Sequence, residues 1–228
     1  MANHRCRRAA GVRNFMRGRF LHTFPMSAAD HSAKRADLTK TADGMESAHR
    51  QSLTREENEM NAHEEAARFL LRHGLQLATA ESCTAGLIAA RIADVPGCGD
   101  ALRCAVVAYA PAIKQRVLGV SPETIRRYGL TSEEVSLAMA RGVLALTDAN
   151  LAIGNTGIAD GKGDDGTPPG TQCFAWIFRQ TGRGNGRTVE FSETVRLRGA
   201  RNEVREAAAE FALAQIPRYY ALAQQRER

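Results

Sequence analysis

From about residue 59 onward, apolar residues recur at helical spacing in some segments and form short continuous runs in others. Ala66, Phe69 and Leu70, for example, fall on one face of a helix that Gly74 ends. These patterns predict helices over residues 55–73, 85–92, from 111, from 121, 131–147 and 200–222, and strands over residues 75–80, 103–109, 149–156, 172–179 and 188–197.

The order of these elements predicts the fold class. Strands first alternate with helices, and the last two strands form a hairpin across the turn at residues 182–186. Ser121 and Thr131 supply helix-capping oxygens, and Pro217 should interrupt the final helix. The 103–109 run is apolar enough to be buried on both faces. We therefore predict a three-layer helix–sheet–helix α/β domain over residues 59–228, with a mixed sheet.

Residues 1–58 lack this periodicity and are expected to be a disordered arm or the product of a misassigned start. The formal net charge of the chain is +6, with 31 basic and 25 acidic residues. Without six arginines near the N-terminus, the basic residues would equal the 25 acidic ones, so nucleic acid is a poor candidate partner. The composition of the arm suits a transit peptide, but we favour translation starting at Met26, Met45 or Met60.

Cysteine and histidine usage narrows the chemistry. The chain has five cysteines, an odd number without a CxxC pair, which fits a reducing cytoplasm; no apolar run is long enough for a bilayer. All six histidines precede Leu75. A histidine-based triad or a zinc site would need His63 or His73 to fold back onto the later motifs.

Ser82, Cys83 and Thr84 follow the first predicted strand, where a helix is about to begin. The start of a helix offers unpaired N–H groups that suit a phosphate, a carboxylate or a developing oxyanion. The segment is therefore a candidate for nucleophile and binding groups. The alternative is that Ser82 or Thr84 simply caps the helix.

Tyr109 and Lys114 follow the second predicted strand and should reach the same edge of a parallel sheet as Ser82. A buried lysine with a lowered pKa can act as a base, and a tyrosine can donate a proton. The alternative is a surface lysine and a tyrosine whose ring lies in the core.

The third predicted strand ends in Thr156 and is followed by Gly157, and both could bind a ligand at that edge. The loop that follows contains Asp160, Asp164 and Asp165, but their spacing matches no EF-hand loop, and an exposed polar loop is the simpler interpretation. Arg201 begins the final helix, where positive charge is disfavoured without a nearby anion. It is a candidate phosphate or carboxylate clamp, or else a solvated arginine.

The chain resembles the C-terminal domain of the CinA family, also found as stand-alone nicotinamide-nucleotide amidases. The resemblance covers about residues 64–222 and combines several motifs in order. These motifs are Thr79-Ala-Glu-Ser-Cys-Thr-Ala-Gly86, Asp94-Val-Pro-Gly97, Val106-Val-Ala-Tyr109 with Lys114, Leu118-Gly-Val120, Thr131-Ser-Glu-Glu-Val135, Thr156-Gly-Ile-Ala159 and residues 199–205.

The resemblance implies a homo-oligomeric amidase that converts nicotinamide mononucleotide to nicotinic acid mononucleotide and ammonia, without metal or organic cofactor. It implies that Ser82 is the nucleophile and that Tyr109 and Lys114 activate it. Thr156 and Arg201 would bind the substrate, with Cys83, Thr84 and Gly157 beside them. The residues themselves agree that a Ser–Lys or Ser–Tyr–Lys arrangement is available without a late histidine. Main-chain N–H groups at the helix start would then hold the oxyanion.

The chain departs from the family pattern in three places. Ala110 and Pro111 follow Tyr109 where Ser-Asn is usual, Ala200 stands where aspartate is common, and the 160–171 loop lacks the usual Gly-Pro and Glu-Lys residues. Three alternatives therefore remain: an amidase with a different substrate, a non-catalytic nucleotide-binding or interaction module, and a nucleophilic Cys83.

Overall fold

A five-stranded sheet with strand order β2-β1-β3-β4-β5 forms the centre of the domain. The three strands β1, β2 and β3 run parallel, and β4 and β5 add an antiparallel hairpin. The mixed sheet predicted from the sequence is confirmed. The strands are β1 (Leu77–Glu81), β2 (Leu102–Val107), β3 (Leu151–Gly157), β4 (Thr171–Arg179) and β5 (Thr188–Arg196).

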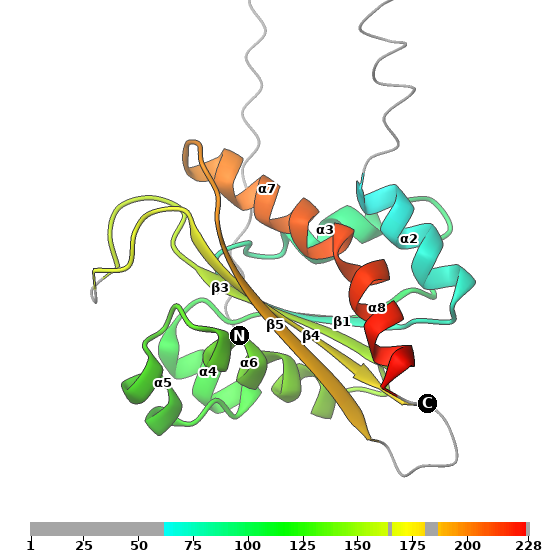
Figure 1. Ribbon diagram of the computed structural model, residues 1–228, viewed down its shortest axis with the longest axis horizontal. Coiled ribbons are helices and arrows are strands. Elements are labelled where there is room, and N and C mark those ends of the chain that lie inside the picture. The colour runs from blue at the N-terminus through cyan, green and yellow to red at the C-terminus, as the bar shows by residue number, and fades with distance from the viewer. Residues whose placement is uncertain (1–61, 164–165, 181–186, 227–228) are drawn as a thin grey trace, which may run out of the picture. The chain divides into compact units, whose positions relative to one another are not determined.

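Helices cover both faces of this sheet in the computed structural model, which describes residues 62–163, 166–180 and 187–226 (Figure 1). One helical layer contains α2 (Ala62–Arg72), α3 (Leu87–Ala93), α7 (Arg201–Ala214) and α8 (Ile216–Gln225). The other contains α4 (Pro111–Leu118), α5 (Pro122–Tyr128) and α6 (Glu133–Ala145). The predicted three-layer architecture is therefore correct. The predicted arm, Asp164, Asp165 and the 182–186 turn lie outside the described residues.

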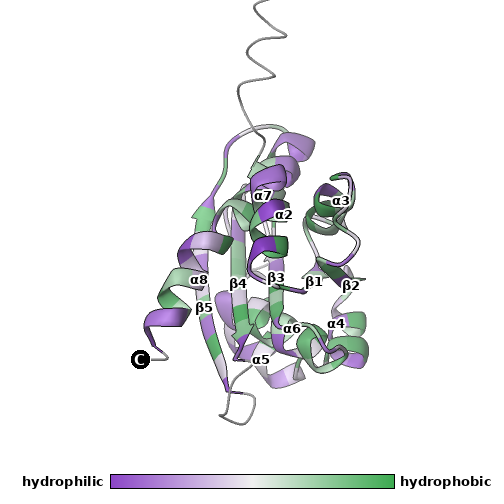
Figure 2. Cartoon of the chain, turned by 90° about the vertical axis from the view of Figure 1, so that its right-hand side faces the viewer, coloured by the Kyte–Doolittle hydropathy of each residue, from purple (hydrophilic) through white to green (hydrophobic). Residues whose placement is uncertain are grey.

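Each face of the sheet buries its own apolar cluster. Trp176 on β4 lies between α7 and α8, where its ring stacks on Tyr219 at 4.5 Å and its Nε1–H donates to Ala212 O at 3.0 Å. The opposite cluster centres on Met139 and Val143 of α6. Hydrophilic residues predominate along α7 (Figure 2), while its apolar residues Val204, Ala208 and Leu213 are buried, so this helix is amphipathic.

The prediction that residues 103–109 are buried on both faces is wrong. β2 pairs only with β1 and forms an edge of the sheet, and its residues alternate between half-buried and exposed. Val107 is 48% exposed, for example. Strand length and apolar content did not separate a central strand from an edge strand, because both carry β-branched and small residues.

The helix boundaries follow local signals. Ser121 Oγ accepts from Thr124 N at 3.0 Å, and Ser132 Oγ, rather than the adjacent Thr131, accepts from Val135 N at 3.3 Å. The predicted final helix is divided into α7 and α8 just before Pro217, because proline cannot donate a main-chain hydrogen bond within a helix.

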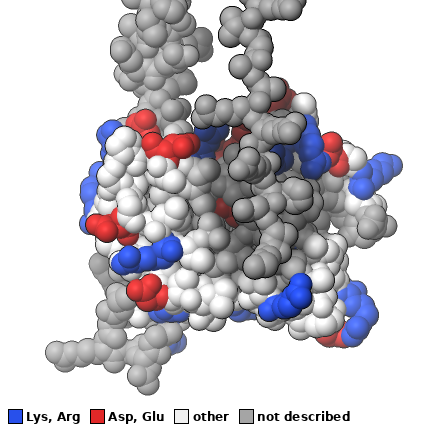
Figure 3. Space-filling model, turned by 180° about the vertical axis from the view of Figure 1, so that it is seen from behind, with Lys and Arg blue, Asp and Glu red and all other residues white. Residues whose placement is uncertain are grey.

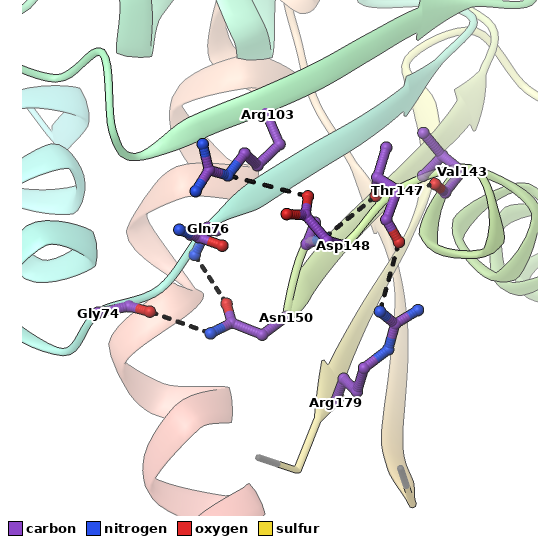
Figure 4. Close-up of polar contacts among 9 residues, drawn as sticks. Gly74, Gln76, Arg103, Val143, Thr147, Asp148, Asn150 and Arg179 are labelled. Carbon is purple, nitrogen blue, oxygen red and sulfur yellow. Dashed lines mark hydrogen bonds and ion pairs between the residues drawn. The ribbon is translucent and has the colours of Figure 1, made fainter.

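Hydrogen bonds between polar groups connect the segments that precede β1 and β3 (Figure 4). Asn150 Oδ1 accepts from Gln76 N at 2.7 Å, and Asn150 Nδ2 donates to Gly74 O at 3.0 Å. Arg179 donates to the main-chain carbonyl of Thr147 at 3.4 Å. These contacts fix the register of the parallel strands, so that their carboxyl ends meet at the opposite edge.

Charge is dispersed over the uncovered part of one face of the molecule. Figure 3 shows basic and acidic side chains interspersed on one face, without a continuous basic stripe. No helix in the described part of the chain is long and apolar enough to cross a membrane.

Candidate functional site

Ser82 lies immediately after β1, at the edge where the parallel strands end. Its N–H donates to Asn155 O of β3 at 3.0 Å, which extends the β1–β3 pairing by one residue. The chain then turns sharply through Ala85 and Gly86, whose φ angles of 50° and 95° lie in the left-handed region. Ala85 is the one non-glycine with positive φ among the described residues, and such strained turns are common at functional sites.

Lys114 contacts Ser82 directly. The helix α4 begins at Pro111, so Lys114 lies in its first turn and points back under the end of β2. Its Nζ lies 2.8 Å from Ser82 Oγ, and only 2% of the lysine is exposed. The alternative of a surface lysine is therefore wrong.

The remaining contacts of the Lys114 amine determine which way its lone pair points. Nζ lies 2.6 Å from Ala108 O and 3.3 Å from Tyr109 O, two carbonyls that can only accept hydrogen bonds. A neutral amine has two N–H donors, which these carbonyls occupy. Its lone pair is then directed at the Ser82 hydroxyl.

Burial favours this neutral form. No carboxylate in the described residues pairs with Lys114, and desolvation lowers its pKa from 10.5 to about 8. Close to neutral pH, an appreciable fraction of the lysine can therefore act as a base towards Ser82.

The carboxylate of Glu81, the last residue of β1, lies at the start of α3, where the sequence had predicted free N–H groups. Its carboxylate accepts from the main-chain N–H groups of Gly86, Ile88 and Ala89 at 2.8–3.2 Å, and from the hydroxyls of Thr79 and Thr84. The prediction that helix N–H groups hold an oxyanion is wrong because the protein's own carboxylate already binds them. The alternative that Ser82 or Thr84 caps this helix is also wrong. Gly86 is the N-cap residue, and glycine has no side chain that could accept a capping hydrogen bond.

Asn155 and Gln172 complete the support of the turn. Asn155 Oδ1 accepts from Thr84 N at 3.1 Å, and Gln172 Nε2 donates to Cys83 Sγ at 3.2 Å. Arg205 of α7 donates to the carbonyls of Cys83 and Thr84 from the other side. The turn that carries Ser82 is thus held from β3, β4 and α7.

The thiol of Cys83 is a poor nucleophile in this setting. Cys83 is only 6% exposed, and burial raises its pKa above 9.0. The raised pKa disfavours the thiolate and hence the hypothesis of a cysteine nucleophile.

Tyr109 contacts Lys114 through its main-chain carbonyl and not through its phenol. Its carbonyl accepts from Lys114, while its phenol oxygen accepts from Arg201 NH2 at 3.0 Å. Tyr109 is 57% exposed, so its ring is outside the core. Arg201 also forms an ion pair with Asp160, so it is neither unpaired nor simply solvated.

A cavity of about 430 Å³ opens onto Ser82. Six of the eight predicted site residues line it, whereas Thr84 and Arg201 do not. Thr84 is fully buried against Glu81 and Asn155, and the Thr156 hydroxyl donates to Leu130 O at 2.8 Å. The complete lining is Ser82, Cys83, Tyr109, Lys114, Ile125, Gly129, Leu130, Thr131, Thr156, Gly157, Ile158, Lys162 and Gly163.

Sequence reasoning did not identify Glu81, Gln172 or Lys162 as site residues. An acidic residue at the end of a buried strand was the available signal for Glu81, because a buried carboxylate needs hydrogen-bond donors. Nothing local to Gln172 or Lys162 indicates their position, which depends on how β4 and the preceding loop pack. The described residues contain no group of three or more His, Cys, Asp or Glu that could hold a metal ion.

The fold and site define an α/β protein with a serine and a buried lysine in contact at the carboxyl edge of the sheet. Residues 59–220 match the family model of the CinA C-terminal domain, and the chain belongs to this family.

Known relatives agree with this assignment. A CinA-like protein of Mycobacterium tuberculosis is 44% identical over 143 residues, which cover 61% of this chain and 31% of the relative. The crystal structure of competence damage-inducible protein A from Klebsiella pneumoniae is 35% identical, with a TM-score of 0.64 over 71% of this chain and 98% of that one. A CinA superfamily protein from Escherichia coli has a TM-score of 0.63 at 30% identity, over 69% of this chain and 88% of its own. This chain spans about a third of the length of the curated relatives it matches.

Proposed function

We propose that this protein is a serine amidase that hydrolyses the amide of nicotinamide mononucleotide, giving nicotinic acid mononucleotide and ammonia. The observation that carries the proposal is the 2.8 Å contact between Ser82 Oγ and the buried Lys114 amine. The resemblance to nicotinamide-nucleotide amidases suggests the substrate, and a cavity of about 430 Å³ lies in the range of small-molecule sites.

In the proposed reaction, neutral Lys114 takes the proton of the Ser82 hydroxyl as Oγ attacks the amide carbon. The resulting ammonium then gives that proton to the departing nitrogen, which leaves as ammonia while an ester forms on Ser82. Lys114 next takes a proton from water, which attacks the ester, and the proton returns to Ser82 Oγ as the acid is released.

In the described turn that follows Ser82, the main-chain N–H of Cys83 is the one left for the oxyanion. From Thr84 to Ala89 every main-chain N–H has an acceptor within the protein. The Cys83 N–H donates to none of the described residues, and Cys83 lines the cavity. We assign it as the oxyanion donor, since the residue after a nucleophile often has this role.

The proposal extends to the setting of the reaction. Four cysteines in the described residues are free thiols, which fits the cytoplasm. We expect the protein to form a homo-oligomer and to act on a small nucleotide rather than on nucleic acid or a membrane. Tyr109 would contribute its main-chain carbonyl to the orientation of Lys114, and a proton-donating role of its phenol remains a prediction from the resemblance.

Ammonia release from nicotinamide mononucleotide tests the proposal. The wild type should turn over, while Ser82→Ala and Lys114→Met should each lose about a thousandfold or more in kcat. Cys83→Ala is the matched control and should retain activity, because its main-chain N–H is unchanged. Loss of activity in Cys83→Ala with Ser82→Ala still active would instead make the thiol the nucleophile.

The 160–171 loop, which lacks the usual Gly-Pro and Glu-Lys residues of the family, favours a second candidate function, that of a non-catalytic nucleotide-binding module. That function predicts measurable binding of the mononucleotide without ammonia release, unchanged by Ser82→Ala. Turnover of another amidated nucleotide, but not of nicotinamide mononucleotide, would indicate an amidase with a different substrate.

A further inference from the structure

Lys162 lies in the loop between β3 and β4, which projects at the left of Figure 1. Main-chain hydrogen bonds close the base of this loop, from Ile158 N to Thr171 O and from Gly170 N to Ile158 O, both at 2.9 Å. A further bond joins Gly163 N to Thr167 O at 3.0 Å, directly after Lys162. These bonds hold the described residues on either side of Lys162, which lies in the wall of the cavity.

Lys162 lines the same cavity as Ser82 and Lys114. No ion pair or hydrogen bond joins the Lys162 side chain to another of the described residues. It thus brings a positive charge to the cavity wall that is not neutralised by these residues.

Arg201, the cation expected to clamp the substrate, is already engaged. Its NH1 pairs with Asp160 and its NH2 donates to Tyr109, and the residue does not line the cavity. The neighbouring Asp160 carboxylate would repel an anion that approached the guanidinium. To bind the phosphate, Arg201 would have to exchange the Asp160 carboxylate for another anion, which changes the binding free energy little.

We propose that Lys162, rather than Arg201, binds the anionic phosphomonoester end of the substrate. This inference rests on the proposed function for the reacting amide and adds the residue that selects phosphorylated over unphosphorylated substrates. Lys162 belongs to the 160–171 loop, which departs from the family pattern. The altered loop therefore still provides a positive charge for the phosphate.

Binding to full-length protein that carries Ser82→Ala tests this assignment without turnover. Calorimetry would give Kd for nicotinamide mononucleotide and for nicotinamide riboside, which lacks the phosphate. Adding Lys162→Gln should weaken mononucleotide binding about tenfold, since a hydrogen bond to a charged group is lost, and leave riboside binding unchanged. Lys162→Arg should restore most of the affinity.

Two further variants separate a local contact from a general effect of charge. Arg116→Gln removes one exposed positive charge of α4 outside the Ser82 cavity and should leave both Kd values unchanged. Arg201→Gln should weaken mononucleotide binding by less than Lys162→Gln. The assignment is overturned if Arg201→Gln causes the larger loss, if Lys162→Gln changes neither Kd, or if the mononucleotide does not bind.

These outcomes are distinct from failure of the proposed function. If the wild type releases no ammonia but Lys162→Gln still weakens mononucleotide binding selectively, the anion site stands and the amidase proposal fails. If ammonia is released and Lys162→Gln leaves binding intact, only the role of Lys162 is wrong.

Discussion

Replacing Lys114 with methionine should remove the base and at the same time relieve a stability penalty. Lys114 is 2% exposed, and burial lowers its pKa from 10.5 to about 8. At about 1.36 kcal/mol per pH unit, this shift disfavours the charged form in the folded state by about 3 kcal/mol. Methionine has a similar length and no charge to desolvate.

The sign of the pH dependence follows from the lowered pKa. Above pH 10.5 lysine is neutral in both the folded and the unfolded chain, so the penalty is absent. As the pH falls from 10.5 to about 8, the unfolded chain takes up a proton that the folded protein does not, and wild-type stability falls. Below about pH 8 the penalty is complete and constant.

The methionine variant does not have the penalty for burying a charged lysine. It does leave the carbonyls of Ala108 and Tyr109 without their amine donor, which lowers the free energy of unfolding by about 1–2 kcal/mol at all pH values. We therefore expect Lys114→Met to be more stable than the wild type by about 1–2 kcal/mol at pH 7, and less stable by a similar amount near pH 10.5. Urea denaturation at intervals across this range measures the difference.

The matched control is Lys162→Met, which removes an exposed lysine and is measured over the same pH range. The reasoning would be refuted if the stability difference between Lys114→Met and the wild type did not vary with pH, because Lys114 would then be charged at pH 8 to 10 in the folded protein.

Three further outcomes follow from the same contacts. Glu81→Gln should destabilise the fold by about 2–4 kcal/mol in urea, because an amide cannot accept all the bonds that the carboxylate does, while the exposed Glu206→Gln should change stability by less than about 0.5 kcal/mol. Gly142→Ala should lower thermal stability by about 1–3 kcal/mol, since its Cβ would overlap the Leu118 main-chain carbonyl, and an unchanged Tm would show that α4 and α6 separate easily. If turnover is observed, kcat/KM should rise with pH through about 8 as Lys114 loses its proton, and a flat profile from pH 6 to 9 would argue against an amine base.

Much of the fold could be predicted because its signals are local. Ser121, Pro111 and Pro217 act through their own main chain, so helix starts and the break in the last helix follow from the sequence. Whether β2 lies at the centre or the edge of the sheet depends on which strands pair with it. The composition of the strand does not contain that information.

The site was predictable where the topology alone brings residues together. Ser82 and Lys114 meet because parallel strands end at one edge of the sheet. The engagement of Arg201 by Asp160 and the placement of Lys162 depend instead on the path of a long loop, and no periodicity describes it. Glu81 was not predicted because its main-chain donors belong to the turn and helix that follow it, whose N–H groups were expected to bind a ligand.

The protonation state of Lys114 is the point on which the proposed chemistry depends, and the chain is well suited to measuring it. The sequence contains four lysines, at positions 34, 40, 114 and 162. Nitrogen NMR of the lysine amines across pH 6–11 should show one resonance titrating near pH 8, and it should be absent from Lys114→Met. Four resonances that all titrate close to 10.5 would contradict a neutral lysine beside Ser82, and with it the proposed amidase mechanism.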